Sequence, residues 1–212
     1  MEKATRRVLI SAPYFQNEIE RFREYLESQG VEIVVPEVRE RLSEEELLQY
    51  IGNIHGVMCG DDAFTERVLA AAPSLKVISK WGTGIDSIDR SACERHGVKL
   101  CNTPNAFTEP VADSVLAYML CFARRTPWMD RHMKAGVWEK IPGFTLREKT
   151  LGIIGVGNIG KAVCRRARAF GMRVLGNDIK TIDPSFVRES GIEIVTFDTL
   201  IAEADFIALC CD

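Results

Sequence analysis

The sequence predicts an α/β fold made of parallel β-sheets, in two successive series of strands and helices. Short β-branched or apolar runs alternate with amphipathic stretches along the whole chain, which is the pattern of repeated strand–helix–strand units. Glycines stand at the ends of several amphipathic stretches, where helices commonly stop. The 212 residues suffice for one large domain or two small ones, with a core that needs no disulfide or metal.

The first series is predicted to contain five strands, at residues 8–11, 32–35, 54–59, 76–79 and 98–101. Helical stretches separate these strands. The first stretch, residues 18–29, ends at Gly30, and the next opens with a capping box from Ser43 to Glu46. Two more cover residues 67–72 and 88–95, the latter ending at Gly97. We therefore expect a first domain over residues 1–104.

The second series begins after residues 108–135, which hold two helical patterns without a strand between them and indicate a bridge between domains. A strand–turn–helix unit follows at residues 150–170 and ends at Gly171. Residues 172–178, 192–197 and 204–211 are the next predicted strands, and Asp183 with Pro184 opens a short helix. We expect this second domain to cover residues 105–212, linking helices included.

The composition is that of an ordinary globular protein. With 46% hydrophobic and 27% charged residues, the chain is unlike disordered, collagen-like or coiled-coil sequences. The net charge is −3 and no block of Lys or Arg occurs, which argues against nucleic acid as a partner. No apolar run approaches the roughly 18 residues of a membrane span and no signal peptide precedes the first strand, so we predict a cytoplasmic protein that does not bind membranes.

Seven cysteines are present without any CxxC spacing, so the sequence predicts neither a disulfide framework nor a metal site. Most of these thiols are expected to be buried as small apolar groups. The adjacent pair Cys210 and Cys211 invites a redox interpretation, but no neighbouring residue is expected to lower a thiol pKa, and packing is the alternative that we favour.

Three glycines form a GxGxxG motif between a predicted strand and a helix: Gly155, Gly157 and Gly160. This is the context of the dinucleotide-binding fingerprint. The first glycine permits a tight turn, the second lets a diphosphate approach the backbone, and the third allows the helix to pack on the strand. Asn158 and Ile159 lie where the amides at the start of the helix would point at the anion. The alternative is a glycine turn that serves packing alone.

Asp178 ends the second strand of this series, close to the spacing of about 20 residues that is typical of a ribose-binding carboxylate. A carboxylate at this position accepts ribose hydroxyls and repels a 2′-phosphate. The sequence therefore predicts NAD rather than NADP as the cofactor. Lys180 is the opposing feature, and a solvated loop charge is its simpler interpretation.

A second glycine loop follows the predicted strand at residues 76–79. Gly82, Thr83 and Gly84 stand directly after that strand, at the carboxyl edge of the sheet, where open α/β folds bind ligands. Their N–H groups are suited to hold a substrate carboxylate as an anion-binding nest. A plain turn is the alternative.

These motifs occur in an order that resembles the D-isomer-specific 2-hydroxyacid dehydrogenases, most of all their phosphoglycerate dehydrogenase branch. The segments are WGTGIDSID at 81–89, NTPNAFTEPVAD at 102–113, ARRTPWMDRHMKAGVWEK at 123–140 and TLGIIGVGNIG at 150–160, followed by Asp178. The resemblance implies a flavodoxin-like substrate domain, long linking helices and a Rossmann-type domain, with NAD between the domains. It also implies hydride transfer between NAD and a small 2-hydroxy or 2-keto acid, and a homo-oligomer, which we expect to be a dimer.

The resemblance implies a role for each matching residue. The loop of Gly82, Thr83 and Gly84 would meet the substrate carboxylate, and Thr83 the cofactor as well. Contacts with NAD are implied for the following residues: Thr108 and Val111 near the nicotinamide, Gly155, Gly157, Asn158, Ile159 and Gly160 at the diphosphate, Asp178 at the adenosine ribose, and Cys211 in the adjoining wall.

The sequence departs from the family pattern at its catalytic residues. The family's catalytic Arg, Glu and His would lie beyond residue 212, so no catalytic residue is assigned here. His55, His96 and His132 have no motif that suits the role. Of the six strands of a Rossmann sheet we find the first four, so we expect a C-terminally truncated dehydrogenase that is inactive alone. The alternative is a non-catalytic protein that binds nucleotide or pairs with a full-length relative.

Two further departures concern single segments. The last predicted strand ends with Cys210, Cys211 and Asp212, where the family has a His, a small residue and a Pro. After the third strand of the first series, Asp61 and Asp62 stand where phosphoglycerate dehydrogenases have an Arg and a Ser that hold the substrate phosphate. Two carboxylates are expected to repel a phosphate, which favours an unphosphorylated acid.

Overall fold

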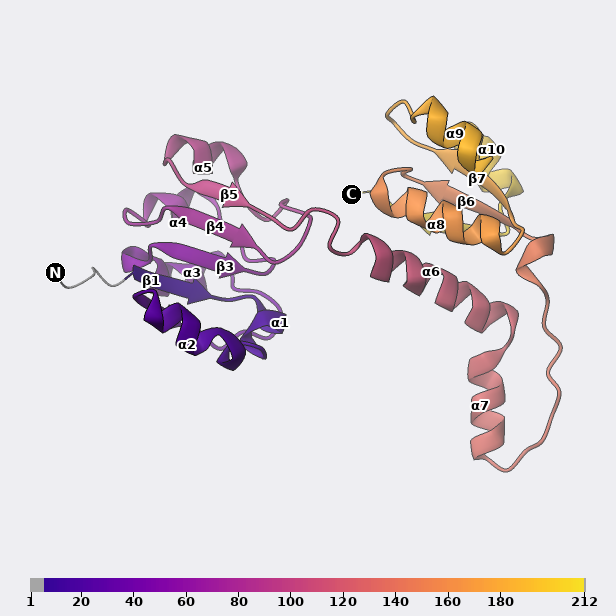
Figure 1. Cartoon of the computed structure of the whole chain (residues 1–212), viewed down its shortest axis with the longest axis horizontal. Coiled ribbons are helices and arrows are strands. Elements are labelled where there is room, and N and C mark those ends of the chain that lie inside the picture. Colours follow the sequence, from indigo (N-terminus) through magenta and orange to yellow (C-terminus); the bar gives the residue numbers. More distant parts are fainter. Residues whose placement is uncertain (1–5, 212) are drawn as a thin grey trace. The chain divides into compact units, whose positions relative to one another are not determined.

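The structure, a computed structural model, describes residues 6–211. The chain divides into two compact units between Ala106 and Phe107, and each unit has its own sheet of parallel strands (Figure 1). The α/β class predicted from the sequence is confirmed.

The sheet of the first unit has five strands in the order β2-β1-β3-β4-β5, all parallel. Their bounds are Arg6–Ile10 for β1, Val31–Val34 for β2, Gly56–Cys59 for β3, Val77–Lys80 for β4 and Lys99–Cys101 for β5. This order is the flavodoxin-like one of doubly wound α/β folds, as the family resemblance implied. Its topological switch point lies at β1 and β3, and the loops after these strands form the edge where such folds bind ligands.

The helices of this unit are α1 (Pro13–Gln16), α2 (Glu20–Ser28), α3 (Glu44–Tyr50), the 3-10 helix η1 (Ile51–Asn53), α4 (Glu66–Ala70) and α5 (Arg90–Arg95). Three of them, α3, α4 and α5, begin at a capping side chain. The predicted capping box at Ser43 and Glu46 is present at the start of α3. Helix α5 begins two residues later than predicted, because the side chain of Asp89 accepts a hydrogen bond from the Ala92 N–H and caps it there.

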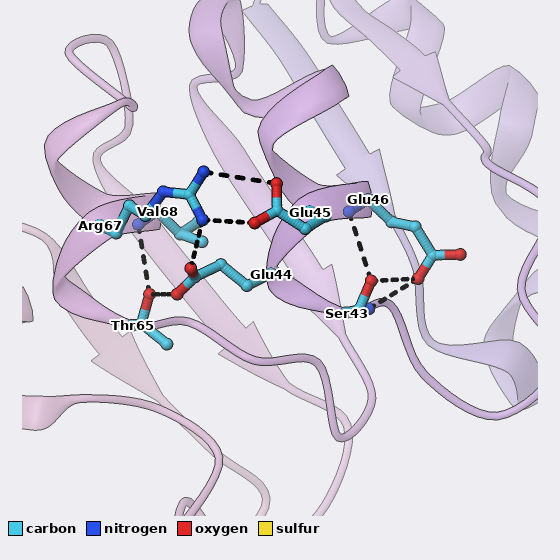
Figure 2. A network of polar contacts seen from close by, with 7 residues as sticks. All are labelled: Ser43, Glu44, Glu45, Glu46, Thr65, Arg67 and Val68. Atoms are coloured by element: carbon cyan, nitrogen blue, oxygen red, sulfur yellow. Dashed lines mark hydrogen bonds and ion pairs between the residues drawn. The ribbon is translucent and has the colours of Figure 1, made fainter.

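A network of charged and polar side chains joins the first turns of α3 and α4 (Figure 2). Arg67 lies 2.7 Å from Glu44 and also pairs with Glu45, while Thr65 donates a hydrogen bond to Glu44. The same Thr65 hydroxyl accepts from the Val68 N–H and caps α4. Both helices are short, and this network fixes their starts against each other above a core that includes Leu47 and Phe64.

The sheet of the second unit has four parallel strands in the order β8-β7-β6-β9. Their bounds are Thr150–Ile154 for β6, Arg173–Asn177 for β7, Glu193–Ile194 for β8 and Phe206–Leu209 for β9. Numbered within the unit, the order is 3-2-1-4, that of the first four strands of a Rossmann sheet. The predicted order of the first four Rossmann strands is therefore confirmed.

The third strand of this sheet is shorter than predicted. Residues 192–197 were expected to form it, but β8 covers Glu193–Ile194 alone. The reason is Thr196, whose side chain accepts from the Thr199 N–H and starts a helix that the sequence analysis did not predict, α10 (Phe197–Glu203). The other helices of the unit are α6 (Thr108–Ala123), α7 (Thr126–Lys134), the 3-10 helix η2 (Leu146–Glu148), α8 (Asn158–Ala169) and α9 (Pro184–Ser190).

Helices α6 and α8 pack side by side over the sheet of the second unit. The buried face of α6 carries Ala112, Leu116, Met119 and Ala123, and small residues of α8 such as Ala162 and Ala167 lie in the same core. Arg166 of α8 reinforces the contact through ion pairs with Glu109 and Asp113 of α6. Helix α7, by contrast, has no buried residue and leads away from this core (Figure 1).

All seven cysteines are free thiols. The expectation that most of them are buried is wrong, because only Cys59, Cys93 and Cys164 are, and Cys211 is exposed. The C-terminal pair follows β9, an edge strand with a neighbour on one side only, so less of the chain covers it. Within residues 6–211, no helix is both long and apolar enough to cross a membrane, and no cluster of three potential metal ligands occurs.

Candidate cofactor and substrate sites

The GxGxxG motif forms the turn from β6 into α8, and two of its glycines stand where no side chain fits. A Cβ at Gly155, whose φ is +88°, would lie 2.6 Å from the backbone nitrogen of Cys211. A Cβ at Gly160 would lie 2.1 Å from the carbonyl oxygen of Gly155. A Cβ at Gly157 would meet nothing within 4 Å, so this glycine faces open space. The turn is thus tight at its ends and open in its middle.

The start of α8 presents backbone amides to that open space. Gly157 is the N-cap residue and provides no side chain to bind them, and Asn158 and Ile159 are the first two residues of the helix. The first amides of a helix have no acceptor within the helix, and the helix dipole adds positive potential there. A diphosphate is an anion that suits such an amide group.

Asp178 lies directly after β7, beside the glycine turn. Its Oδ2 accepts a hydrogen bond of 2.7 Å from the N–H of Val156, inside the GxGxxG segment, and its Oδ1 accepts one of 2.8 Å from the N–H of Lys180. These two hydrogen bonds lower the pKa of the Asp178 carboxyl, with Lys180 the larger contributor. Each carboxylate oxygen has a second lone pair, so the side chain can still accept from a ligand hydroxyl.

A hollow of about 340 Å³ continues from Asp178 along the same edge of the sheet. Aliphatic side chains line it, among them Ile182, Ile194 and the fully exposed Ile179. Three parts of a dinucleotide find matching groups here. The amides at the turn suit a diphosphate, the carboxylate beside the turn suits a ribose, and the apolar side chains next to the carboxylate suit a base. The residues present therefore fit a dinucleotide.

Cys211 lies next to this turn, as the 2.6 Å approach of its backbone nitrogen to a Cβ at Gly155 indicates. The preceding Cys210 donates its N–H to Ile154 of β6. Thr108 and Val111 lie in the first turn of α6, where both side chains are at least partly exposed. Asp212, which the sequence analysis compared with a Pro, lies outside the described residues.

The second glycine loop follows β4 in the first unit and is held by its carbonyl groups. The Gly82 carbonyl accepts from the N–H of Thr103 at 3.0 Å, and the Thr83 carbonyl accepts from the side chain of Asn102 at 2.7 Å. Among residues 6–211, no acceptor is found for the N–H of Thr83 or Gly84. This loop therefore has amides available for an anion.

A hollow of about 520 Å³ adjoins the loop and contains four charged side chains: Arg41, Asp61, Lys80 and Asp86. Lys80 is only 4% exposed; its Nζ donates to the Gly60 carbonyl at 2.6 Å and also pairs with Asp61. The backbone approaches this lysine closely at the loop, because a Cβ at Gly82 would lie 3.2 Å from the Lys80 Cε. The lysine thus links the ends of β3 and β4 beneath the loop.

The argument that two carboxylates repel a phosphate here is wrong for Asp62. This side chain is fully buried and accepts 2.5 Å hydrogen bonds from the Ser11 hydroxyl and from the N–H of Leu42. Burial raises the pKa of its carboxyl. Asp61 does line the hollow, but Lys80 offsets its charge.

Residues 116–212 match the family model described as D-isomer specific 2-hydroxyacid dehydrogenase, NAD binding domain. These residues belong to the NAD-binding domain of the D-isomer specific 2-hydroxyacid dehydrogenases. NAD is the cofactor of this family of domains, and the prediction of NAD from the sequence is thereby confirmed.

Relatives within the D-2-hydroxyacid dehydrogenase family align with nearly the whole chain. A D-3-phosphoglycerate dehydrogenase of Archaeoglobus fulgidus is 34% identical over 206 residues, which are 96% of this chain and 38% of that protein. A glyoxylate reductase of Thermococcus onnurineus is 32% identical over 213 residues, 96% of this chain and 62% of that one. The chain thus spans between about a third and two thirds of the length of these relatives.

The fold of the family is found in solved structures. The crystal structure of a D-lactate dehydrogenase from Aquifex aeolicus, complexed with NAD and lactic acid, matches with a TM-score of 0.81 and 26% identity. The match covers 96% of this chain and 60% of that chain.

Sequence reasoning missed Arg41, Lys80 and Trp81, which all line the hollow beside the glycine loop. Lys80 and Trp81 stand immediately before Gly82, so their position after a parallel strand was a usable signal. Trp81 packs against Phe15, with ring centroids 5.3 Å apart. Arg41 had no comparable signal, because it reaches the hollow from the loop that precedes α3.

Proposed function

We propose that this chain provides the substrate-binding unit and the ADP-binding half of an NAD-dependent oxidoreductase. The reaction is hydride transfer between NAD and a small 2-hydroxy or 2-keto acid, as in phosphoglycerate dehydrogenase-like enzymes. The observation that carries the proposal is the hydrogen bond from the Val156 N–H to Asp178, which fixes a carboxylate beside an open glycine turn. The family to which residues 116–212 belong supports the same conclusion.

In this proposal the second unit binds the cofactor. The amides of Gly157, Asn158 and Ile159 hold the diphosphate, and Gly155 and Gly160 allow the close packing that shapes the turn. Asp178 accepts hydroxyls of the adenosine ribose, and its negative charge disfavours a 2′-phosphate. When bound, NAD supplies the hydride acceptor of the reaction.

The remaining contacts with the cofactor are proposed for residues near the turn or in the first turn of α6. Cys211 forms part of the wall beside Gly155, and Thr108 and Val111 lie near the nicotinamide end. All three are proposals drawn from the family resemblance. Their common feature in the structure is that none of them is buried.

In the first unit we propose that the loop Gly82, Thr83 and Gly84 binds the substrate carboxylate through its amides. Within residues 6–211 the N–H groups of Thr83 and Gly84 have no acceptor, which supports this role. Thr83 also takes part in binding the cofactor. The carboxylate is thereby oriented by backbone groups that the fold holds in place before the substrate arrives.

No histidine among residues 6–211 is proposed as the proton acceptor, because each is engaged elsewhere. His55 accepts from the Arg7 N–H, His96 contacts Glu66 and His132 lies 3.0 Å from the carboxylate of Glu139. The family's Arg, Glu and His have no counterpart assigned in this chain. We therefore expect residues 1–212 alone to bind nucleotide without turnover.

The proposal is tested by calorimetric titration of the 212-residue chain with NAD, ADP and NADP. We expect weak and comparable binding of NAD and ADP, and weaker binding of NADP. Asp178→Ala should weaken binding of NAD and ADP. The matched control is Asp205→Ala, because Asp205 likewise accepts from a backbone N–H, that of Thr150, and has a lowered carboxyl pKa, but lies at the opposite end of β6.

Equal loss of binding in both variants would mean that Asp178 acts through stability alone, and absence of ADP binding in the unsubstituted chain would refute the fingerprint interpretation. Nicotinamide absorbance with a panel of 2-keto acids measures turnover. Turnover by this chain would show that a residue within it accepts the proton, contrary to the assignment above.

We also propose that the chain associates with itself through its second unit. Helix α7 has no buried residue, and Trp138 after it is 80% exposed. The edge strand β9 exposes Ile207 and Leu209. Light scattering after gel filtration should give twice the monomer mass, and a monomer at all concentrations would contradict the proposal.

A further inference from the structure

The hollow beside the Gly82–Gly84 loop has two cations, and one of them is already bound. Lys80 donates to the Gly60 carbonyl and pairs with Asp61, so a ligand at its Nζ would have to compete with both. Arg41 lines the same hollow and makes no hydrogen bond or ion pair with any residue between 6 and 211. Its guanidinium is therefore available to a ligand.

The carboxylates near this hollow do not cancel the charge of Arg41. Asp62 is buried with Ser11 and the Leu42 N–H, and Asp61 is paired with Lys80. Asp86 lines the same hollow and lies beside Gly84, since a Cβ at Gly84 would lie 3.4 Å from its carboxylate, but within residues 6–211 it forms no ion pair with Arg41. A second acceptor group on a bound acid can thus pair with Arg41 without displacing an existing ion pair.

The backbone next to Arg41 is held by hydrogen bonds to the loop that follows β3. Leu42 donates its N–H to Asp62 at 2.5 Å and accepts from the N–H of Ala63 at 3.3 Å. Leu42 itself is 3% exposed and lies in the core, and Ser43 directly begins α3. Arg41 is therefore one residue away from an anchored position, although it precedes the helix in an irregular loop.

We propose that Arg41 is a specificity-determining residue that binds a second anionic group of the substrate, and that Asp62 is its positioning residue. The inference rests on the proposed function, because the first carboxylate is taken to bind at the glycine loop. The preferred substrates are then 2-hydroxy or 2-keto acids with a further carboxylate or a phosphate ester. Both groups match the planar donor fork of a guanidinium.

The test measures binding to the full 212-residue chain labelled with ¹⁵N, through the amide resonances of Thr83 and Gly84. Three probes are used: D-lactate with one anionic group, D-malate with two carboxylates, and 3-phospho-D-glycerate with a phosphate. A charged hydrogen-bonded pair is expected to lower Kd about tenfold or more, so at least one dianionic probe should bind that much more tightly than D-lactate. Which of the two does so identifies the second group as carboxylate or phosphate.

Variants assign the preference to Arg41. Arg41→Gln should bring the ratio of the Kd for D-lactate to the Kd for the preferred dianionic probe close to one, and should change the Kd for D-lactate by no more than about twofold. Arg41→Lys should keep part of this ratio because the charge remains. Arg39→Gln is the matched control, since Arg39 carries the same charge two residues away and lines a different hollow. This control should keep the full ratio.

Asp62 is tested by the same ratio. Asp62→Ala removes the acceptor for the Leu42 N–H and should lower the ratio, whereas Asp62→Asn retains an oxygen for that N–H and should restore it. If Asp62→Ala weakened the binding of all three acids equally, the variant would have lost structure generally, and this result would overturn the positioning role of Asp62.

Equal binding of all three acids to the unsubstituted chain, or an unchanged ratio in Arg41→Gln, would overturn the proposal for Arg41 and leave the glycine-loop site standing. No response of Thr83 and Gly84 to any acid would instead remove the proposed substrate site. The two failures are therefore distinguishable.

Discussion

Replacing Gly157 and Gly160 singly by alanine should separate ligand binding from stability within one turn. The same methyl group is added in both variants, three residues apart. At Gly160 it would lie 2.1 Å from a backbone carbonyl oxygen and 3.2 Å from the side chain of Ile153. At Gly157, with φ of −75°, it would meet no protein atom within 4 Å.

The magnitudes follow from these contacts. Relief of the contact at Gly160 requires the start of α8 and the Gly155 carbonyl in the turn to separate by about an ångström, an overpacking that costs about 3 kcal/mol. Alanine in a helix is favoured over glycine by about 1 kcal/mol, so the net loss is about 2 kcal/mol. At Gly157, alanine caps the helix less well than glycine, which lowers stability, but it also reduces the entropy of the unfolded chain, which raises stability. The two effects offset each other to within about 0.5 kcal/mol.

Urea unfolding, followed at the amide resonances of β6 and β7, measures the stability of the second unit by itself. Gly160→Ala should shift its midpoint by about 1 M, and Gly157→Ala by much less. Titration with ADP should show the reverse order among folded proteins, with Kd raised at least tenfold in Gly157→Ala, about 1.4 kcal/mol. Unchanged ADP affinity in Gly157→Ala would refute the view that a diphosphate approaches the backbone there, and an unchanged midpoint in Gly160→Ala would refute the steric argument.

Three other predictions concern single side chains. Thr65→Ala should lower the stability of the first unit by about 1 kcal/mol in urea unfolding because α4 loses its cap, and Thr65→Ser should retain it. Alkylation at pH 8, followed by peptide mass spectrometry, should modify the exposed Cys211 first, and ADP should slow this reaction. Burial raises the pKa of Cys59 to about 12, so this thiol should not react until the protein unfolds. Equal alkylation rates for the two thiols would contradict the prediction. Asp62→Asn should become more stable relative to the unsubstituted chain as the pH rises above about 3.9. The reason is that the raised pKa of Asp62 makes ionisation of this carboxyl unfavourable in the folded state. A difference in unfolding free energy that stays constant between pH 4 and pH 7 would contradict the prediction.

Much of the fold was predictable because its signals are local. Glycines ended helices where the backbone adopts a positive φ, as at Gly30, Gly97 and Gly171. Buried parallel strands are recognisable as short apolar runs in the sequence, and this signal does not depend on which strands they pair with. The prediction failed at residues 192–197, where an apolar run at the sheet edge competes with the capping side chain of Thr196 and the helix takes the last residues.

The arrangement of the candidate cofactor site was predictable for the same reason. Its main elements are a glycine turn and an aspartate one strand away, and adjacent parallel strands bring their carboxyl ends together. What the sequence could not give is the hydrogen bond from Val156 to Asp178, which depends on the path of the backbone through the turn. That bond decides the direction in which the carboxylate points.

The hollow beside the Gly82–Gly84 loop was harder to predict because its side chains come from separate segments. Asp61 and Asp62 are neighbours in the sequence, but one lines the hollow and the other is buried with Ser11. Nothing in the spacing of the residues distinguishes them, since the partners of Asp62 are 20 and 51 positions away. A motif therefore predicts a candidate anion-binding loop, while the charge that surrounds the loop depends on long-range packing.

This difference explains why the cofactor is easier to assign than the substrate. In both units the anion is proposed to meet backbone N–H groups, and a glycine loop after a parallel strand supplies these without any particular side chain. Discrimination between one acid and another must come from side chains that line the hollow beside the Gly82–Gly84 loop, such as Lys80 and, from a distant part of the chain, Arg41. Exchanging those side chains should thus change which acid binds while leaving nucleotide binding in the second unit intact.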